Sequence, residues 1–344
     1  MSNCREARWT LCDSLQRRNE YTPRIITMGK DSNFSLRPGE PSGAGVIRVL
    51  DVLFQNAIGR LEHSGSADEE DIHAVRTTVK RVRAILRLVQ HTIGNATFRK
   101  ENQRLQQTAQ LLAPMRDAAI GLHTLRGLAS TARRKQKRKD VSIVHDRFAK
   151  HVPSPHAVPQ EGVMRATVRA LEAHRRRLWK LRIISADWCA MGMGLEKVYG
   201  ACRRRMKRAF SEGDDDSFHR WRIRLKNLYY ELQFLNPICS RRLRLMTARL
   251  KKLETMIGDD HDIAVLKASL QKTPEHFGGG PVVERVLRQL KERSQKLRRA
   301  MRPLAATVLD EEPDRFARRI HRSMAKWQKT AGSRETTEPR RNAV

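Results

Sequence analysis

Apolar residues recur with a helical period over most of the chain, from about residue 46 to residue 329. In segment 72–89 they are separated by four, three, four and three positions, which places them along one face of an α-helix. These residues are Val75, Val79, Val82, Leu86 and Val89. No segment alternates apolar and polar residues as a half-buried strand does. The pattern therefore predicts an all-α fold.

Turn-forming residues, among them Gly94, Pro114 and Gly258, divide this pattern into separate helices. The predicted helices cover residues 46–63, 69–92, 97–112, 116–133, 162–184, 188–211, 215–235, 240–257, 260–271, 282–303 and 312–329. The basic run at 133–139 is predicted to be a solvated helix end or a loop. Glycine and proline are frequent in 29–45, so residues 1–45 are predicted to form a disordered or linker arm. The polar residues 331–344 are predicted to form a disordered tail.

Segment 72–89 recurs at 218–235 with an offset of 146 residues, and the match continues downstream with an offset of 145. The apolar frame aligns too, because Trp221, Leu225, Leu228, Leu232 and Leu235 occupy the matching positions. The aligned polar pairs are His73 with His219, Arg76 with Arg222, Lys80 with Lys226, Arg104 with Arg249, and Asp117 with Asp262. An internal repeat of this length predicts two copies of a helical unit of about four helices.

Repeat one is predicted to span residues 46–150 and repeat two residues 188–330, with a linker and connecting helix at 151–187. Each repeat carries a second stripe about 200° around the helix from its apolar face, at roughly 100° per residue. In repeat one this stripe consists of cationic residues, namely His73, Arg76, Lys80, Arg83 and Arg87. If the two repeats pack about a pseudo-twofold axis and turn these stripes toward it, they line one cationic groove.

The overall charge narrows the possible partners. Lys and Arg number 69 and Asp and Glu 37, so the net charge is +32. Such a charge attracts polyanions at long range, and nucleic acid, an anionic membrane surface and inorganic polyphosphate are the candidates. Small neutral substrates do not explain it. No stretch approaches the roughly 20 apolar residues that a bilayer-spanning helix needs, so we expect no membrane span.

Cysteine usage predicts a reducing cytoplasm. The chain has an odd number of cysteines and no CxxC pair, which argues against a zinc ribbon and against a disulfide framework. They are Cys4, Cys12, Cys189, Cys202 and Cys239. The first 30 residues lack the apolar region of a secretory signal. The sequence leaves open whether Met28 is the true start.

The sequence gives little support for a metal site or a phosphate-binding loop. The run Asp259-Asp260-His261-Asp262 invites a metal site, but the equivalent in repeat one is Arg116-Asp117, and arginine cannot ligate a metal there. The glycines at 278–280 lack the Lys-Ser/Thr that completes a phosphate-binding loop. We therefore expect no metal, no small-molecule cofactor and no enzymatic activity.

Two HxxRxxx[KR] segments, each followed some 40 residues on by an [RH]D pair, resemble the CHAD family, the conserved histidine α-helical domain. The pairs are Arg116-Asp117 and His261-Asp262. The resemblance covers residues 46–330 and implies an all-helical fold of two four-helix bundles around a basic central groove or pore. It also implies binding of inorganic polyphosphate, often at polyphosphate granules. Repeat two departs from the pattern with Asn227 and Tyr229 in place of Arg81 and Arg83, and Arg224 is a possible substitute.

The predicted site suits a phosphate chain. Arginine forms bidentate bonds to phosphate oxygens, lysine acts as a point charge, and histidine donates when protonated. The predicted polyphosphate-binding residues are His73, Arg76, Lys80, Arg81, Arg83, Arg87, Arg104, Arg116, His219, Arg222, Arg224, Lys226, Arg249, Lys252 and His261. Asp117 and Asp262 would repel phosphate. They are predicted to organise structure, by capping a helix start or by orienting a neighbouring cation.

The leading hypothesis is therefore a non-enzymatic, cytoplasmic polyphosphate-binding protein that is associated with polyphosphate granules. The same charge leaves open a nucleic-acid-binding or nucleoid protein, although no helix-turn-helix, zinc finger or aromatic stacking platform is evident. An enzyme acting on polyphosphate or a phosphoester would need carboxylates or a metal converging on the groove. The sequence leaves open the preferred chain length of polyphosphate, the oligomeric state, any protein partner and the role of the N-terminal arm.

Overall fold

The computed structural model describes residues 34–37, 39–63, 69–112, 114–131, 134–151, 160–236 and 241–335. Within these ranges the chain forms α-helices and two short 3-10 helices, and no strand is present, so the all-α prediction is confirmed. The helices are α1 (Ser42–His63), α2 (Glu69–Leu88), α3 (Gln90–Ile93), α4 (Asn95–Leu111), α5 (Pro114–Thr131), α6 (Lys135–His151), α7 (Gln160–Leu178), η5 (Arg182–Ser185), α8 (Trp188–Glu212), α9 (Asp215–Phe234), α10 (Arg241–Lys272), η7 (Pro274–Phe277), α11 (Gly280–Val308) and α12 (Pro313–Glu335).

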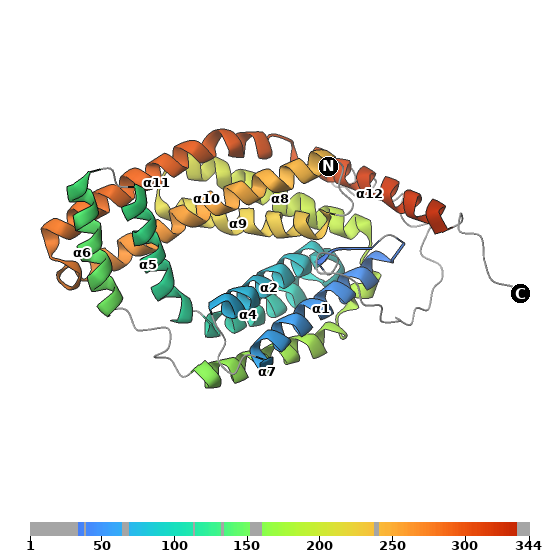
Figure 1. Ribbon diagram of the computed structural model, residues 1–344. Helices are drawn as coiled ribbons and strands as arrows, with labels where there is room; N and C mark the ends of the chain where they lie inside the picture. Colours follow the sequence, from blue (N-terminus) through green and yellow to red (C-terminus); the bar gives the residue numbers. More distant parts are fainter. Residues whose placement is uncertain are drawn as a thin grey trace, which may run out of the picture.

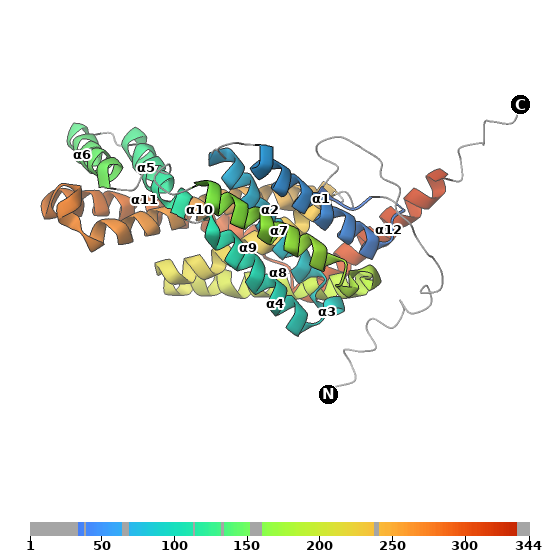
Figure 2. The same cartoon turned by 90° about the horizontal axis from the view of Figure 1, so that it is seen from below.

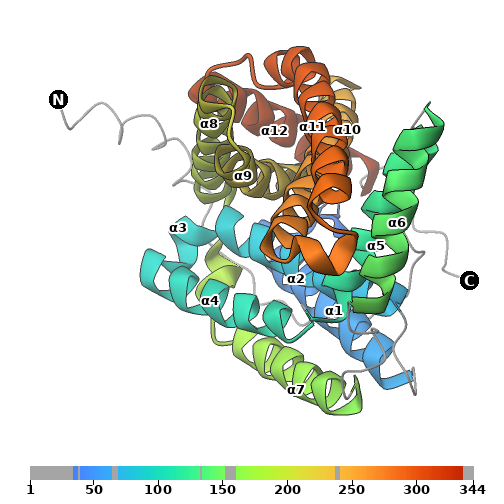
Figure 3. The same ribbon diagram turned by 90° about the vertical axis from the view of Figure 1, so that its left-hand side faces the viewer.

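The helices lie in two groups that meet where α2 packs against α9. In the first group α1 contacts α2 and α7, and α4 contacts α2 and α7. In the second group α8 contacts α9 and α12, and α10 contacts α9 and α11. Figure 1 shows the first group below the second. Figure 3 shows the same two groups from the left-hand side of that view. None of the described helices is long and apolar enough to cross a bilayer.

The main hydrophobic core joins both groups. Every residue of the two predicted apolar stripes is buried in it. One stripe runs along α2 to Val89, just after the helix, and the other runs along α9 to Leu235, just after that helix. Trp221, Tyr199, Phe234 and Phe316 are among its largest fully buried side chains. This burial leaves the polar faces of α2 and α9 for other contacts.

Helices α5 and α6 project from the main body together with the adjoining ends of α10 and α11 (Figure 2). They have a smaller core of their own. Its members include Leu125 on α5, Phe148 on α6, Leu266 on α10 and Leu290 on α11. Gly121 lies so close to the ring of Phe148 that a β-carbon there would overlap it.

The helices differ from the prediction most clearly at α6, α10 and α1. Helix α6 was not predicted. It begins within the basic run at 133–139, and its many charged residues obscure the apolar period of Val141, Val144 and Phe148, which are buried. Helix α10 continues through Gly258, where a break was predicted, since a lone glycine weakens a helix without ending it. Helix α1 begins at Ser42 and not at residue 46.

The first turn of α1 packs closely on η5. The first turn of α1 passes so close to the backbone of Ile183 and Ile184 that a β-carbon on Gly43 would overlap it. Leu36, within the predicted arm, is buried in the main core. Residues 1–33 and 336–344 lie outside the described residues, so the predictions for the rest of the arm and for the end of the tail stay untested.

The start of α9 is fixed by a capping residue. Asp214 has an extended backbone, and its side chain accepts a hydrogen bond from the backbone N–H of Ser217 at 2.7 Å. Asp215 and Asp216 follow in the first turn, where carboxylates favour the helix dipole. This start sets the positions of His219, Arg222 and Lys226 along α9.

Candidate functional site

The cationic face of α2 lies along α4. Arg76 Nη1 donates to the backbone carbonyl of Ala109 at 3.2 Å, and Arg83 Nε donates to Asn102 Oδ1 at 2.9 Å. The residue numbers fall on α4 as they rise on α2, so the two helices are antiparallel. We call this boundary the α2–α4 seam. The predicted stripe of repeat one therefore borders a second helix along much of its length.

The α2–α4 seam ends at Arg87, whose guanidinium carbon lies 5.4 Å from the ring centroid of Phe98. Burial lowers the pKa of Arg83. Burial, together with the charges of Arg83 and Arg224, lowers the pKa of Arg87 to about 10. Only Glu231, among the groups acting on Arg87, opposes this shift.

The cationic face of α9 lies along α10 in the same antiparallel manner. Across this α9–α10 seam, His219 Nδ1 lies 3.2 Å from His261 Nδ1, and the ring centroids are 4.7 Å apart. Lys251 Nζ lies 5.5 Å from the ring centroid of Tyr229. Both histidines were predicted as site residues, and the structure brings them together.

A carboxylate interrupts the cations of the α9–α10 seam. Lys226 Nζ lies 2.7 Å from Glu254 Oε1, and Lys251 Nζ lies 3.0 Å from Glu254 Oε2. Burial alone would raise the pKa of Glu254, but the two ammonium groups outweigh it and lower the pKa to about 2. Glu254 was not predicted, although its spacing of three residues from Lys251 is a recognisable helical ion pair.

The register of the α9–α10 seam places Arg222 opposite Gly258, between the histidine pair and the Lys226–Glu254 pair. A β-carbon on Gly258 would meet no atom within 4 Å, so the helix leaves open space at that position. Arg222 is half-buried, and its charge lowers the pKa of His219 after the larger effect of burial. In the α2–α4 seam the equivalent Arg76 also lies opposite a small residue, Ala109.

A charged cluster lies where α2 packs on α9. Glu231 is fully buried, and neither of its carboxyl oxygens has a hydrogen-bond partner. Burial raises the pKa of Glu231 well above its ordinary value, and the charge of Arg87 opposes this only in part. Arg83 and Arg224 both lie within electrostatic range of Arg87 here, because the charge of each acts on it. This region therefore holds an excess of positive charge.

Arg104 is held by a polar network that the sequence did not reveal. Its Nη1 lies 2.5 Å from Glu101 Oε1, and about a third of the Arg104 side chain is exposed. Burial would raise the pKa of Glu101, but contacts with His174 and Arg104 and the charge of Arg177 outweigh it and lower the pKa to about 2. Glu101 lies three residues before Arg104, a spacing typical of ion pairs on a helix, so this pair could have been predicted from the sequence.

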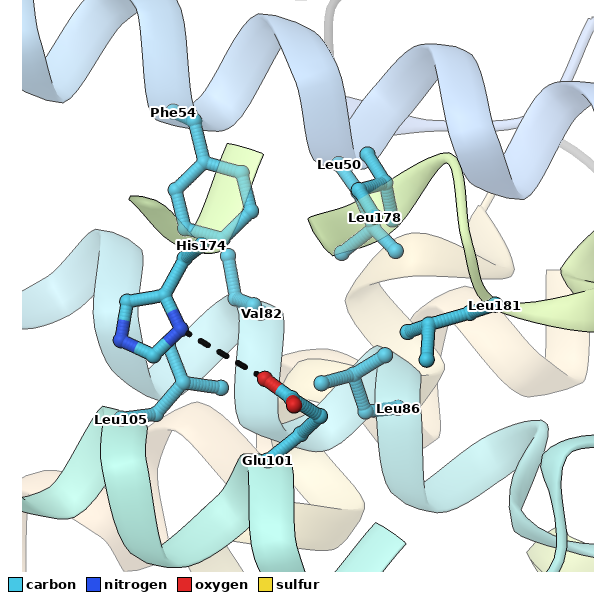
Figure 4. Close-up of a pocket in the computed structure, with 9 residues that line it drawn as sticks. All are labelled: Leu50, Phe54, Val82, Leu86, Glu101, Leu105, His174, Leu178 and Leu181. Carbon is cyan, nitrogen blue, oxygen red and sulfur yellow. Dashed lines mark ion pairs between the residues drawn. The ribbon is translucent and has the colours of Figure 1, made fainter. Parts of the chain in front are cut away.

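The network continues into the interface of α4 with α7. His174 Nδ1 lies 3.7 Å from Glu101 Oε2, an ion pair drawn in Figure 4, and 3.0 Å from Arg177 Nη2. His174 Nε2 lies 3.0 Å from Thr108 Oγ1, and its ring stacks on Phe54 at 6.0 Å. The small cavity beside it is lined mainly by leucine side chains, and its polar lining residues, Glu101 and His174, are paired with each other. The network fixes Glu101, and Glu101 in turn fixes Arg104.

Other predicted residues occupy varied surroundings. Arg81 does not lie in the α2–α4 seam, because its guanidinium stacks over Phe34 at 4.5 Å and reaches Gln233 on α9 at 3.5 Å. His73 and Lys252 are exposed. Lys80 and Arg249 are half-buried. The side chains of Arg116 and Asp117 lie outside the described residues, so their predicted roles stay predictions.

Asp262 caps no helix, contrary to the expectation, because α10 runs without a break from Arg241 to Lys272. Its predicted role in orienting a neighbouring cation stays a prediction. Asp260, two residues earlier, is buried and accepts hydrogen bonds from Ser294 Oγ at 2.5 Å and from Arg298 Nε at 3.0 Å. It ties α10 to α11. Among the described residues no three His, Cys, Asp or Glu side chains are grouped so that they could hold a metal ion.

The chain is similar to a known protein family and to two solved structures. The family model described as CHAD domain matches residues 48–271. PptA from Streptomyces chartreusis is 14% identical with a TM-score of 0.49, and the match covers 84% of this chain and 100% of that one. The crystal structure of the CHAD domain from the plant Ricinus communis is 15% identical with a TM-score of 0.48, and that match covers 87% of this chain and 96% of the other. The chain matches no curated protein. Because the family match spans more than half of its residues, this protein belongs to the CHAD domain family.

Proposed function

We propose that this protein binds inorganic polyphosphate along the α2–α4 and α9–α10 seams, with Arg83, Arg87 and Arg224 at the centre of the site. The excess of positive charge where α2 packs on α9 carries this proposal. Three guanidinium groups share that region, while burial favours the uncharged form of Glu231. Buried charge is costly without a partner of opposite charge, so an anion with several charges suits this region.

Phosphate fits the side chains present. The planar guanidinium group bonds two phosphate oxygens at once, and such charge-assisted bonds are about twice as strong as neutral ones. Arg83, at the centre of the proposed site, is already held by its hydrogen bond to Asn102. Little side-chain freedom is then lost when a phosphate binds, which favours affinity.

A polymer fits better than a small phosphate ester. Helices α2 and α9 have 20 residues each, which is about 30 Å at 1.5 Å per residue. At 1.5 Å per residue, cations recur over about 17 Å of α2, from Arg76 to Arg87, and over about 11 Å of α9, from His219 to Lys226. A flexible chain with about one charge per phosphate can engage many of them at once. A single phosphate group would use only a few.

The proposed arrangement is two four-helix bundles related by pseudo-symmetry. Helices α1, α2, α4 and α7 would form one bundle and α8, α9, α10 and α12 the other, with α2 and α9 in equivalent positions. Two observations support this: α2 packs directly on α9, and each borders its own seam partner in an antiparallel manner. The basic groove would then run between the bundles, with both seams along it.

We propose binding without catalysis. Two carboxylates near the seams are engaged with cations, Glu101 with Arg104 and Glu254 with Lys226. Neither is arranged as a general acid or base. Incubation with polyphosphate for hours, with and without divalent metal, is expected to release no phosphate. Turnover that disappears in Asp262→Ala would contradict this part of the proposal.

Calorimetric titration with long-chain polyphosphate at physiological salt, with and without excess duplex DNA, tests the proposed ligand. We expect tight binding that survives the DNA and weakens as salt rises, because bound cations release counterions. Loss of polyphosphate binding in excess DNA would favour the nucleic-acid alternative. The proposed granule association predicts that a fluorescent fusion protein concentrates on polyphosphate granules in cells.

A further inference from the structure

The α9–α10 seam contains a pair of histidines with unusual mutual geometry. His219 and His261 present the same ring atom to each other, and the two Nδ1 atoms lie 3.2 Å apart. The rings are inclined by 36° with centroids 4.7 Å apart. A hydrogen bond at this distance needs one Nδ1 that carries a proton and one that does not. The two neutral rings must therefore be opposite tautomers.

This constraint determines which Nε2 atoms of the pair carry a proton. In the neutral pair one Nε2 carries a proton and the other does not. One added proton converts the second ring to an imidazolium, which still donates its Nδ1–H to its partner. Both Nε2 atoms then carry protons. A second added proton would place N–H groups on both Nδ1 atoms and break the bond between the rings.

Burial and the nearby arginines favour the neutral form of His219 in the absence of an anion. On α9, burial lowers the pKa of His219 first, Arg222 and Arg220 lower it further, and Asp216 opposes them. On α10, Asp262 neighbours His261 in sequence. Helices α5 and α11 contribute His123 and Arg293, whose charges act on Asp259 two residues away.

We propose that polyphosphate binding to this seam is coupled to the uptake of a single proton by the His219–His261 pair. The inference rests on the proposed function and adds its regulation. Phosphate oxygens only accept hydrogen bonds, so they bind better to two N–H donors than to one donor and one bare nitrogen. The phosphate charge also favours the imidazolium over the neutral ring. The proton comes from the buffer and stays on the pair while the anion is bound.

The sign of the pH dependence follows from this coupling. Bound polyphosphate raises the pKa of the pair above its value in the free protein. Affinity therefore rises as pH falls from the bound pKa to the free pKa, and it levels off below the free pKa because the pair is then already protonated. One coupled proton gives at most about a tenfold change in affinity per pH unit. Internal phosphates of a long chain do not titrate in this range, so the effect belongs to the protein.

Calorimetry at pH 7 in several buffers of different ionisation enthalpy measures the number of protons taken up. We expect close to one proton per bound chain segment for the wild-type protein, and less by about that amount in His219→Gln. His261→Gln provides a second variant at the same site. His151→Gln, an exposed histidine on α6, is the matched control and should behave as wild type.

The outcomes separate the two claims. Tight binding by wild type without proton uptake would overturn the coupling and leave the proposed function standing. Uptake that persists unchanged in both His219→Gln and His261→Gln would place the proton elsewhere and would also overturn it. Absence of polyphosphate binding by wild type would remove the proposed function itself, and the coupling with it.

Discussion

The ammonium group of Lys226 on α9 lies 2.7 Å from the carboxylate of Glu254 on α10, in the middle of an otherwise cationic seam. Only 15% of the Lys226 side chain and 11% of the Glu254 side chain are exposed. A residue predicted to bind phosphate is thus already paired with an acidic group. The carboxylate competes with any anion that approaches Lys226, and it also keeps the cations of the seam from repelling one another.

Replacing Glu254 with glutamine should strengthen polyphosphate binding, because Lys226 loses its competing partner. We expect affinity to rise about three- to fivefold, as a partly buried ion pair is worth about 1 kcal/mol. Calorimetric titration at physiological salt measures this change. Glu292→Gln is the matched control. Glu292, on α11, is exposed and pairs with Lys137 on α6, and its replacement changes the net charge equally. Weaker binding by Glu254→Gln than by Glu292→Gln would show that Glu254 supports the site.

Acid should weaken the fold through Glu101 and Glu254. Both carboxyl groups have a pKa of about 2 in the folded protein, below their value in the unfolded chain. Their contribution is therefore complete above about pH 4.5 and is lost as pH falls toward 2. Each contributes up to about 3 kcal/mol, at 1.36 kcal/mol per pKa unit.

Urea unfolding at pH 6 and pH 3 checks this. The double variant Glu101→Gln with Glu254→Gln should lose less stability between the two values than wild type. An equal loss in both proteins would mean that other carboxylates cause the acid sensitivity.

Glu231 should make the fold less stable as pH rises, the reverse of the effect of Glu101 and Glu254. Its folded-state pKa is raised by burial, so the folded protein holds a proton that the unfolded chain releases. Its contribution is present below about pH 4.3 and is lost as pH rises above that value toward the folded pKa. Glu231→Gln, an uncharged side chain of similar shape, should therefore be more stable than wild type at pH 8 by about 1 kcal/mol or more. Urea unfolding at pH 5 and pH 8 measures the difference.

The exposed Glu62→Gln is the control for Glu231, and it should leave the pH dependence unchanged. If Glu231→Gln were instead less stable than wild type at pH 8 by about 2 kcal/mol, the carboxylate would be charged and paired with Arg87.

Close helix packing makes Gly194 intolerant of a side chain. On α8 it lies so near the backbone carbonyl of Leu88, at the end of α2, that a β-carbon would overlap it. Gly194→Ala should therefore cost about 1–3 kcal/mol of unfolding free energy. Gly162→Ala on α7, where a β-carbon meets nothing within 4 Å, should instead raise stability by up to about 1 kcal/mol. Equal effects of the two changes in urea unfolding would contradict the crossing of α8 over α2.

The apolar period alone predicted the all-α fold and the two buried stripes of α2 and α9, because burial of one helical face dictates that period. It failed for α6, whose many charged residues obscure Val141 and Val144. It also failed at Gly258, because a single glycine weakens a helix but does not end it when tertiary contacts hold both sides.

The sequence predicted the site only in part. The repeat identified His219 and His261, but their contact depends on how α10 packs along α9. Glu231 belongs to the packing side of α9, and nothing in its sequence neighbourhood marks it as a fully buried carboxyl group. His174 lies on α7, outside both repeated motifs, and reaches Glu101 only through the tertiary fold.

The most direct test of the central claim compares two variants with the same net charge. The first changes Arg83, Arg87 and Arg224 to glutamine. The second changes Arg288, Arg299 and Arg322, which are exposed on α11 and α12. Circular dichroism and urea unfolding establish that both fold. Calorimetric titration with long-chain polyphosphate at physiological salt should then show at least about a hundredfold loss of affinity for the first, since each charge-assisted bond contributes about 1.5–3 kcal/mol, and little loss for the second. Equal affinity of the two variants would mean that diffuse charge, and not the region where α2 packs on α9, binds the polyanion.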